Sequence, residues 1–134
     1  MAVDLAALGD VEPLWRDWLD DAARRVRVDV NELDEQLPNW RRLLERFAED
    51  RAPVYLRRDA DVTAALRRLH GGGVRIGVFA DVPEELMRIA LSHLGADGRV
   101  EVVESGEGAR ERLLAKLGNA ATVVRTRAEL VALA

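Results

Sequence analysis

Two aspartates follow apolar segments that have the character of short strands. Asp81 comes shortly after the apolar run Val74–Phe79, and Asp4 follows the first three residues of the chain. Open α/β sheets bind their ligands at the carboxyl ends of parallel strands, so a carboxylate there can contact a ligand. We therefore expect any functional site to lie at Ala80–Val82. Simpler roles remain open, because Asp81 can cap the following helix and Asp4 can be a solvated or helix-capping carboxylate.

The segment Val74–Phe79 is the element that would position Asp81. A short apolar run of this kind is typical of a central parallel strand covered on both faces. Gly71 is expected to end the preceding helix as a left-handed cap. Pro83 suits the first turn of the next helix, and the two glutamates after it add the negative charge that a helix amino end favours.

The chain alternates between helices and strands from residue 60 onward. Asp59 or Asp61 can cap the first of these helices, and Thr126 the last. We predict strands at 74–79, 100–103 and 121–124, and helices at 83–94, 109–117 and 127–133. This alternation predicts a parallel sheet with right-handed crossovers. Strand 74–79 should lie next to 100–103, with residues 1–5 on its other side if they form a strand and not the frayed start of a helix.

Residues 12–50 have helical periodicity and contain all three tryptophans. Two or three helices are expected here, including a short one over 32–36 that Asn31 can cap. The segment Ala52–Leu56 contains Pro53 and is predicted to be an extended connection.

Composition narrows the range of functions. The chain has 134 residues, no cysteine, two histidines and a net charge of -4. One domain with a core is possible at this length, whereas thiolate chemistry is absent and a histidine metal site is not expected. The acidic balance argues against nucleic-acid binding as the main role, and no apolar run is long enough to span a membrane. A cytoplasmic protein without a signal peptide is expected.

The chain resembles the haloacid-dehalogenase (HAD) superfamily, whose members are mostly phosphatases. The likeness is strongest over residues 66–105, where helix, glycine, apolar strand, helix and strand follow one another in the family's order. The resemblance implies that the helices of residues 10–50 correspond to the family's helical cap, inserted after the first strand. It also implies an aspartate nucleophile, a second aspartate as general acid and base, a Ser or Thr and a basic residue at the phosphoryl group, and acidic ligands of magnesium.

The functional residues of the family are matched only in part. Asp4 matches the nucleophile, which also binds the metal in the family, but Ala6 stands in place of the second aspartate. Ala80 replaces the hydroxyl residue, and Asp81 stands where Asn is common. Arg110 is a stand-in for the basic residue, with Lys116 on the same helix as an alternative. Arg125 and the threonine after it replace the acidic pair.

The sequence thus predicts an α/β fold: a small three-layer parallel sheet of HAD/Rossmann-like type with an N-terminal helical cap-like segment. We expect a single domain over residues 1–134, with residues 10–50 as the cap-like insertion. The leading hypothesis is a HAD-like pseudoenzyme that serves as a binding or regulatory module, with a site at Asp4, Ala80, Asp81, Arg110 and Arg125.

Two other functions stay open. One is a magnesium-dependent phosphohydrolase that uses Asp4 as nucleophile and metal ligand. The other is a structural subunit whose tryptophan-bearing helices pack on a partner protein. The expected partners are a small anionic or phosphorylated ligand and either a second copy of the chain or another protein. No cofactor is expected unless the protein is active, in which case it is magnesium.

Overall fold

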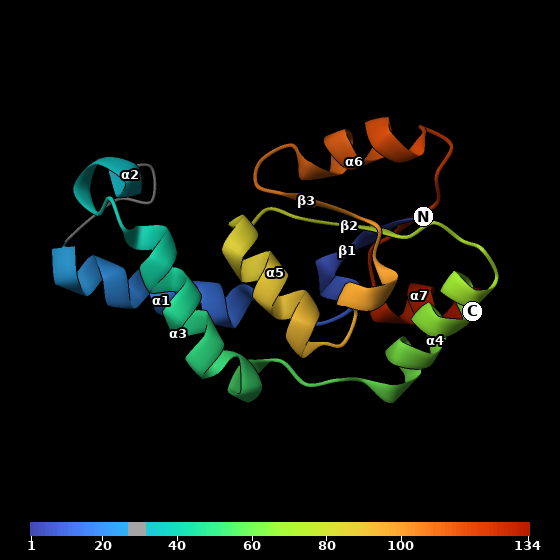
Figure 1. Cartoon of the computed structure of the whole chain (residues 1–134), viewed down its shortest axis with the longest axis horizontal. Helices are drawn as coiled ribbons and strands as arrows, with labels where there is room; N and C mark the ends of the chain where they lie inside the picture. Colours follow the sequence, from blue (N-terminus) through green and yellow to red (C-terminus); the bar gives the residue numbers. More distant parts are fainter. Residues whose placement is uncertain (27–31) are drawn as a thin grey trace.

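A four-stranded parallel sheet forms the centre of the protein (Figure 1). The computed structural model describes residues 1–26 and 32–134. The strands lie in the order β3-β2-β1-β4, and every neighbouring pair is parallel. Their bounds are β1 (Ala2–Asp4), β2 (Gly77–Ala80), β3 (Val102–Ser105) and β4 (Val123–Val124). The parallel sheet and the placement of β2 between β1 and β3 confirm the sequence prediction.

Helices cover both faces of the sheet, which gives three layers (Figure 1). Side chains alternate along the strands, so Val78 faces the larger core cluster while Phe79 packs with Ala109 and Leu113 of α6. The helices of this part are α4 (Ala60–Gly71), α5 (Glu84–His93), α6 (Ala109–Leu117) and α7 (Arg127–Leu133), with short 3-10 turns η1 (Leu5–Ala7) and η3 (Asp97–Arg99). Helix α6 lies on one face and α4, α5 and α7 on the other. In the described part of the chain, no helix is long and apolar enough to cross a membrane.

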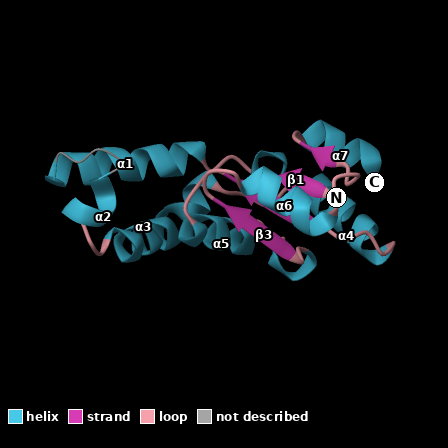
Figure 2. Cartoon of the chain, turned by 90° about the horizontal axis from the view of Figure 1, so that it is seen from above, coloured by secondary structure: helices cyan, strands magenta, loops and turns pink. Residues whose placement is uncertain are grey.

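The N-terminal helices extend away from the sheet (Figure 2). They are α1 (Glu12–Val26), α2 (Leu33–Gln36) and α3 (Trp40–Tyr55). Trp18 of α1 contacts Trp40 of α3, with the ring centroids 5.9 Å apart, and this contact joins the two helices. Trp18 also stacks on Trp15 of its own helix, at 5.6 Å between centroids. Helix α3 then packs on α5, where two ion pairs link them: Arg41 with Glu85 at 3.0 Å and Arg88 with Glu45 at 2.8 Å. The helical segment is therefore attached to the sheet domain through α5.

The prediction of an extended connection at Ala52–Leu56 is wrong. Helix α3 continues through Pro53 and ends at Tyr55, and only Leu56 has an extended backbone. Proline removes one helical hydrogen bond and usually breaks a helix interior. Here Ala48 and Ala52 are fully buried, and Leu56 donates its N–H to the Ala52 carbonyl at 2.7 Å. Tertiary packing of the last turns outweighs the local preference of the proline.

The predicted boundaries of the strands and of α4 need small corrections. Strand β2 begins at Gly77 although Ile76 is already fully buried, because burial extends beyond the hydrogen-bonded ladder. Helix α4 includes Gly71, and the left-handed residue is Gly73, with φ of 83°. The predicted strands 100–103 and 121–124 likewise begin two residues later, at Val102 and Val123. Asn31, predicted as a cap, lies outside the described residues.

Other local predictions are confirmed. Helix α6 has the predicted bounds 109–117. Asp59 caps α4 by accepting the N–H groups of Asp61 and Val62, and Thr126 caps α7 by accepting the N–H of Glu129. These caps are short-range contacts, which is why sequence alone could predict them.

Candidate functional site

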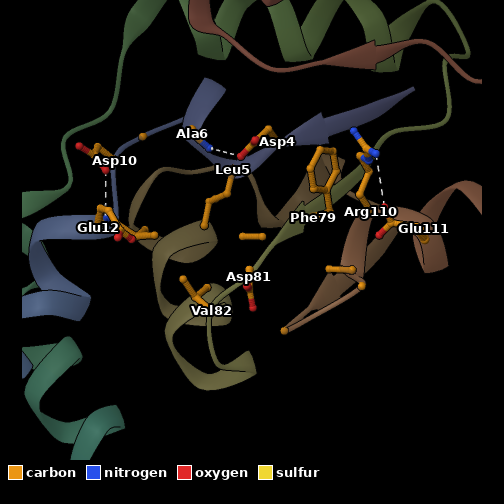
Figure 3. A pocket seen from close by; sticks show the side chains of 16 residues that line it. Asp4, Leu5, Ala6, Asp10, Glu12, Phe79, Asp81, Val82, Arg110 and Glu111 are labelled. Atoms are coloured by element: carbon orange, nitrogen blue, oxygen red, sulfur yellow. Dashed lines mark hydrogen bonds and ion pairs between the residues drawn. The ribbon is translucent and has the colours of Figure 1, made fainter. Parts of the chain in front are cut away.

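A pocket of about 390 Å³ opens at the carboxyl ends of β1 and β2 (Figure 3). Its walls come from η1, from the residues after β2, from the start of α1 and from the amino end of α6. Open parallel sheets bind ligands at this place. The lining includes four of the five predicted site residues: Asp4, Ala80 and Asp81 at the strand ends, and Arg110 from α6.

Asp4 is the last residue of β1 and lies beside Phe79 of β2 in the sheet. One of its carboxylate oxygens accepts the N–H of Ala6 at 3.0 Å and so caps η1. The side chain is half-buried. Asp4 therefore combines the strand-end position that the HAD resemblance requires with the capping role that was its simpler interpretation.

Ala6 and Ala80 line the same pocket as Asp4. Ala6 is two residues after Asp4 in η1, and Ala80 ends the neighbouring strand β2. Both side chains are single methyl groups, which can neither transfer a proton nor donate a hydrogen bond to an oxyanion. The pocket thus has the strand-end geometry without the acid and the hydroxyl that the resemblance calls for.

The prediction that Asp81 caps α5 is wrong. The residue at the cap of α5 is Pro83, and no side chain caps this helix. Gly106 donates its N–H to the carbonyls of Ala80 and Val82, at 3.0 and 3.1 Å. These contacts tie the turn after β2 to the loop after β3, and the Asp81 side chain in this turn is exposed. Within the described residues, Asp81 makes no hydrogen bond or ion pair.

The basic residues are placed differently from one another. Arg110 lines the pocket and forms an ion pair with Glu111 at 3.4 Å (Figure 3). Arg125 follows β4 but is not among the lining residues, so the structure does not bring it to the pocket. The alternative Lys116 lies elsewhere on α6 and pairs with Glu104.

The loop between β3 and α6 is held by charged contacts outside the pocket. Arg112 forms an ion pair with Glu104 at 3.0 Å and donates to the carbonyls of Ser105 and Glu107. Lys116 and Arg112 together hold the pKa of the Glu104 carboxyl below its usual value, because both stabilise its charged form. Sequence analysis did not single out Arg112, whose role depends on the fold that brings strand and helix together.

Asp10 and Glu12 also line the pocket and were not predicted to be site residues. Asp10 accepts the N–H of Glu12 at 3.0 Å at the start of α1. The available sequence signal was an aspartate just before a helix, which indicates a cap but not a pocket. The charged lining now consists of one arginine, Arg110, and five carboxylates: Asp4, Asp10, Glu12, Asp81 and Glu111.

The set of acidic ligands that the resemblance calls for around magnesium is not assembled among the described residues. Magnesium binds octahedrally to oxygen, usually with one or two carboxylates and several waters. Among residues 1–26 and 32–134, no group of three or more His, Asp or Glu side chains is placed to hold a metal ion. Arg125 and Thr126 follow β4 at the position where the resemblance calls for acidic ligands. The residues present therefore do not fit the metal that the family resemblance implies.

A second hollow extends from the pocket towards the tryptophans. It shares Asp81, Val82 and Gly106 with the first pocket, and its other wall includes Trp15 and Trp40. Trp15 and Trp40 of the helical segment thus lie across this hollow from residues that follow β2 and β3. This is the side on which a cap-like segment would lie.

Comparison with known proteins supports the fold. No protein-family profile and no curated protein sequence matches the chain. A similar solved structure is that of a "putative beta-phosphoglucomutase from Thermotoga maritima", with a TM-score of 0.55 and 15% sequence identity. The alignment covers 98% of this chain and 79% of that one. The α/β fold is therefore of HAD/Rossmann-like type, in agreement with the sequence prediction; at this identity the likeness concerns the fold alone.

Proposed function

We propose that this chain is a HAD-like protein that has lost efficient hydrolase chemistry and serves as a binding or regulatory module. The observation that carries this proposal is that Ala6 and Ala80 line the same pocket as Asp4. Helices α1 to α3, within the predicted residues 10–50 and the few that follow, are its cap-like insertion, because Trp15 and Trp40 line a hollow opposite the residues after β2 and β3.

The missing groups act on different parts of a phosphoryl transfer. General acid–base help is worth about 10²- to 10⁴-fold in rate, and Ala6 cannot supply it. Metal charge neutralisation is worth several kcal/mol of transition-state stabilisation, and among the described residues no three His, Asp or Glu side chains converge on one ion. These losses concern one transition state and need not add, yet each alone leaves little turnover.

The charged residues that line the pocket also affect how strongly an anionic ligand would bind. A small anionic or phosphorylated ligand would meet Arg110 and the amino end of α6, which favour it. It would also meet the five carboxylates, which repel it. An anion without a compensating cation is therefore expected to bind weakly, and binding should strengthen when a lining carboxylate is neutralised.

The proposal is tested by an assay of the purified protein against a panel of phosphomonoesters with added magnesium. The matched control is Asp4→Asn, which keeps the cap on Ala6 through an amide oxygen while removing the nucleophile. We expect no turnover above the Asp4→Asn background. Turnover that the substitution abolishes would refute the loss of catalysis.

That refuting result would establish the main alternative, a magnesium-dependent phosphohydrolase built on Asp4. One observation favours this alternative: Asp4 is at the end of β1 and lines the pocket, as the nucleophile of the resemblance requires. A gain-of-function variant sharpens the test. Introducing Ala6→Asp together with Ala80→Ser should raise phosphatase activity if only those groups are missing.

The third possibility, a subunit that docks through its tryptophans, has less support. Trp18 and Trp40 are 2% and 6% exposed, and their rings pack on one another within the chain. Trp40 also donates its indole N–H to Asp34 at 2.7 Å. These indoles are already used in the core of the helical segment and offer little surface to a partner.

A further inference from the structure

The hollow beside the tryptophans has a lining unlike that of the pocket at Asp4. Its volume of about 560 Å³ falls within the range of small-molecule sites. Trp15 and Trp40 stand on one side of this tryptophan hollow, and residues that follow β2 and β3 stand on the other. An aromatic wall opposite a polar one suits a ligand group that is both flat and charged.

Three carboxylates of the tryptophan hollow have no cation beside them. They are Asp81 in the turn after β2, Glu84 in the first turn of α5 and Glu107 in the loop after β3. All three residues are exposed, and within the described part of the chain none of these carboxylates forms a hydrogen bond or an ion pair. In Figure 3 the side chain of Asp81 points away from Asp4 and Arg110. The polar side of the hollow therefore carries uncompensated negative charge among the described residues.

Arg41 shows how this hollow holds a cation. Its guanidinium carbon lies 4.4 Å from the centroid of the Trp40 ring, and the same group donates to the two carboxylate oxygens of Glu85 at 3.2 and 3.0 Å. A guanidinium is planar, so it stacks on an indole while its N–H groups donate to carboxylates at its edge. The Trp40 side of the hollow is thus already occupied by a cation of the chain, and that cation is paired.

Trp15 offers the same kind of surface without a cation. One face of its ring stacks on Trp18, with the ring centroids 5.6 Å apart. Trp15 is half-buried and lines the hollow, and among the described residues no guanidinium or ammonium group lies over its ring. The second face of this indole can therefore take a cation from a ligand, as the ring of Trp40 takes Arg41.

The placement of the carboxylates favours an organic cation over a metal ion. In the described part of the chain, no group of three or more His, Asp or Glu side chains is placed to hold one metal ion. The carboxylates of the hollow come from three separate segments and do not form such a group. A guanidinium has five N–H donors that point in different directions, so it can reach carboxylates that do not converge on one point.

We propose that the tryptophan hollow binds a small ligand through a guanidinium group, which stacks on Trp15 and donates to the carboxylates of Glu84 and Glu107. This inference rests on the proposed role of the chain as a binding module and names the chemistry of its ligand. Asp81 lines both the hollow and the pocket at Asp4, so the bound cation also offsets negative charge where the two cavities meet.

The test is an NMR titration of the isotope-labelled full chain with butylguanidinium. The signals to follow are the indole N–H of Trp15 and the main-chain N–H of Gly106, since both residues line the hollow. We expect a saturable shift of both signals, and Kd should rise with salt because the attraction is electrostatic. A titration that shifts neither signal, or that does not saturate, would overturn the proposal.

Two control ligands separate the guanidinium from its parts. Butylurea has nearly the same shape without the charge and should cause no saturable shift. Magnesium chloride supplies charge without a planar group and should not displace butylguanidinium at equal ionic strength. Equal binding of butylurea would show that the hollow only takes up apolar chains, and displacement by magnesium would show that it attracts any cation. Either result would overturn the proposal.

Variants at exposed carboxylates test the site without disturbing the core. Glu84→Gln and Glu107→Gln should each raise Kd for butylguanidinium roughly two- to fivefold, the range expected for an exposed ion pair. The matched control is Glu101→Gln, which removes the same charge just before β3, whereas Glu107 follows that strand. It should leave Kd unchanged. Equal effects of all three substitutions would reduce the binding to net charge and would contradict a built site.

Trp15→Leu tests the stacking surface, with Gly106 as the reporter. This substitution should raise Kd about fivefold or more, because the cation then has no ring to lie on. An unchanged Kd would rule out Trp15 as the contact. A failed titration overturns the guanidinium site while the loss of catalysis stands, whereas phosphomonoester turnover that depends on Asp4 refutes the loss of catalysis and leaves the titration as measured.

Discussion

The residues that hold the walls of the pocket differ from the residues that face into it. Outside the pocket, Glu104 is paired with both Arg112 and Lys116, and Asp59 caps α4 while pairing with Arg127. Inside it, Ala6 and Ala80 have no polar atom in their side chains. The surrounding scaffold thus contains several ion pairs, whereas these two positions in the pocket lack the polar groups that catalysis would need.

The turns that shape the pocket near β2 and β3 are therefore held by groups that do not face into it, whereas Asp4 both lines the pocket and caps η1. The turn after β2 is fixed by the two hydrogen bonds from Gly106, and the loop after β3 is fixed by Arg112. A module that binds without reacting needs only such a preformed shape.

The buried strand should show the largest loss of stability. Ile76, directly before β2, is fully buried in the larger core cluster. Replacing Ile76 by Ala should lower the free energy of unfolding by about 2–5 kcal/mol, because it removes buried methyl groups and leaves a cavity. Urea denaturation measures the change. Val54→Ala, at an exposed position, is the control and should stay within about 0.5 kcal/mol. A loss at Ile76 no larger than the control would show that this segment is not part of the core.

The close contact between β2 and α6 should produce the next largest effect. A Cβ added at Gly77 would lie 2.5 Å from Cδ1 of Leu113 and 3.1 Å from Cδ1 of Leu117. Gly77→Ala should cost about 1–3 kcal/mol through overpacking. A double-mutant cycle with Leu113→Ala checks the cause, since removing the Leu113 side chain makes room. Strictly additive losses would rule out this contact as the source.

The sequence predicted the sheet more fully than it predicted the site. The alternation after residue 60 depends on local periodicity, so it predicted the parallel sheet and the central place of β2. The continuation of α3 through Pro53 could not be predicted, because it depends on packing of Ala48 and Ala52. The turn that contains Asp81 is held by hydrogen bonds from Gly106, which is distant in sequence. Asp10 and Glu12 reach the pocket only because the chain turns back after η1.

Acid should weaken the scaffold through Glu104. Lys116, and then Arg112, lower its pKa in the folded protein below the ordinary value of 4.5. A lowered pKa gives stability that is present above the unfolded value and is lost as the pH falls through the folded value. Stability should therefore decline below about pH 4.5. Glu104→Gln should be less stable at neutral pH and should show a shallower decline in acid. Urea denaturation at a series of pH values provides the measurement, and parallel curves for the two proteins would contradict the assignment.

The smallest effect is expected at Asp81, where the comparison between scaffold and lining is sharpest. A true helix cap contributes about 0.5–2 kcal/mol, and Thr126 is one, since its hydroxyl accepts the Glu129 N–H at 3.2 Å. Thr126→Ala should therefore lose stability by that amount. Asp81→Ala should change the free energy of unfolding by less than about 0.5 kcal/mol, because the exposed carboxylate makes no hydrogen bond or ion pair within the described residues. Chemical denaturation of the two variants side by side is sufficient. Equal losses of stability in the two variants would mean that Asp81 caps α5 in solution and belongs to the scaffold. If Asp81→Ala leaves the stability unchanged, the carboxylate of the unchanged protein has no structural role and is available to a ligand.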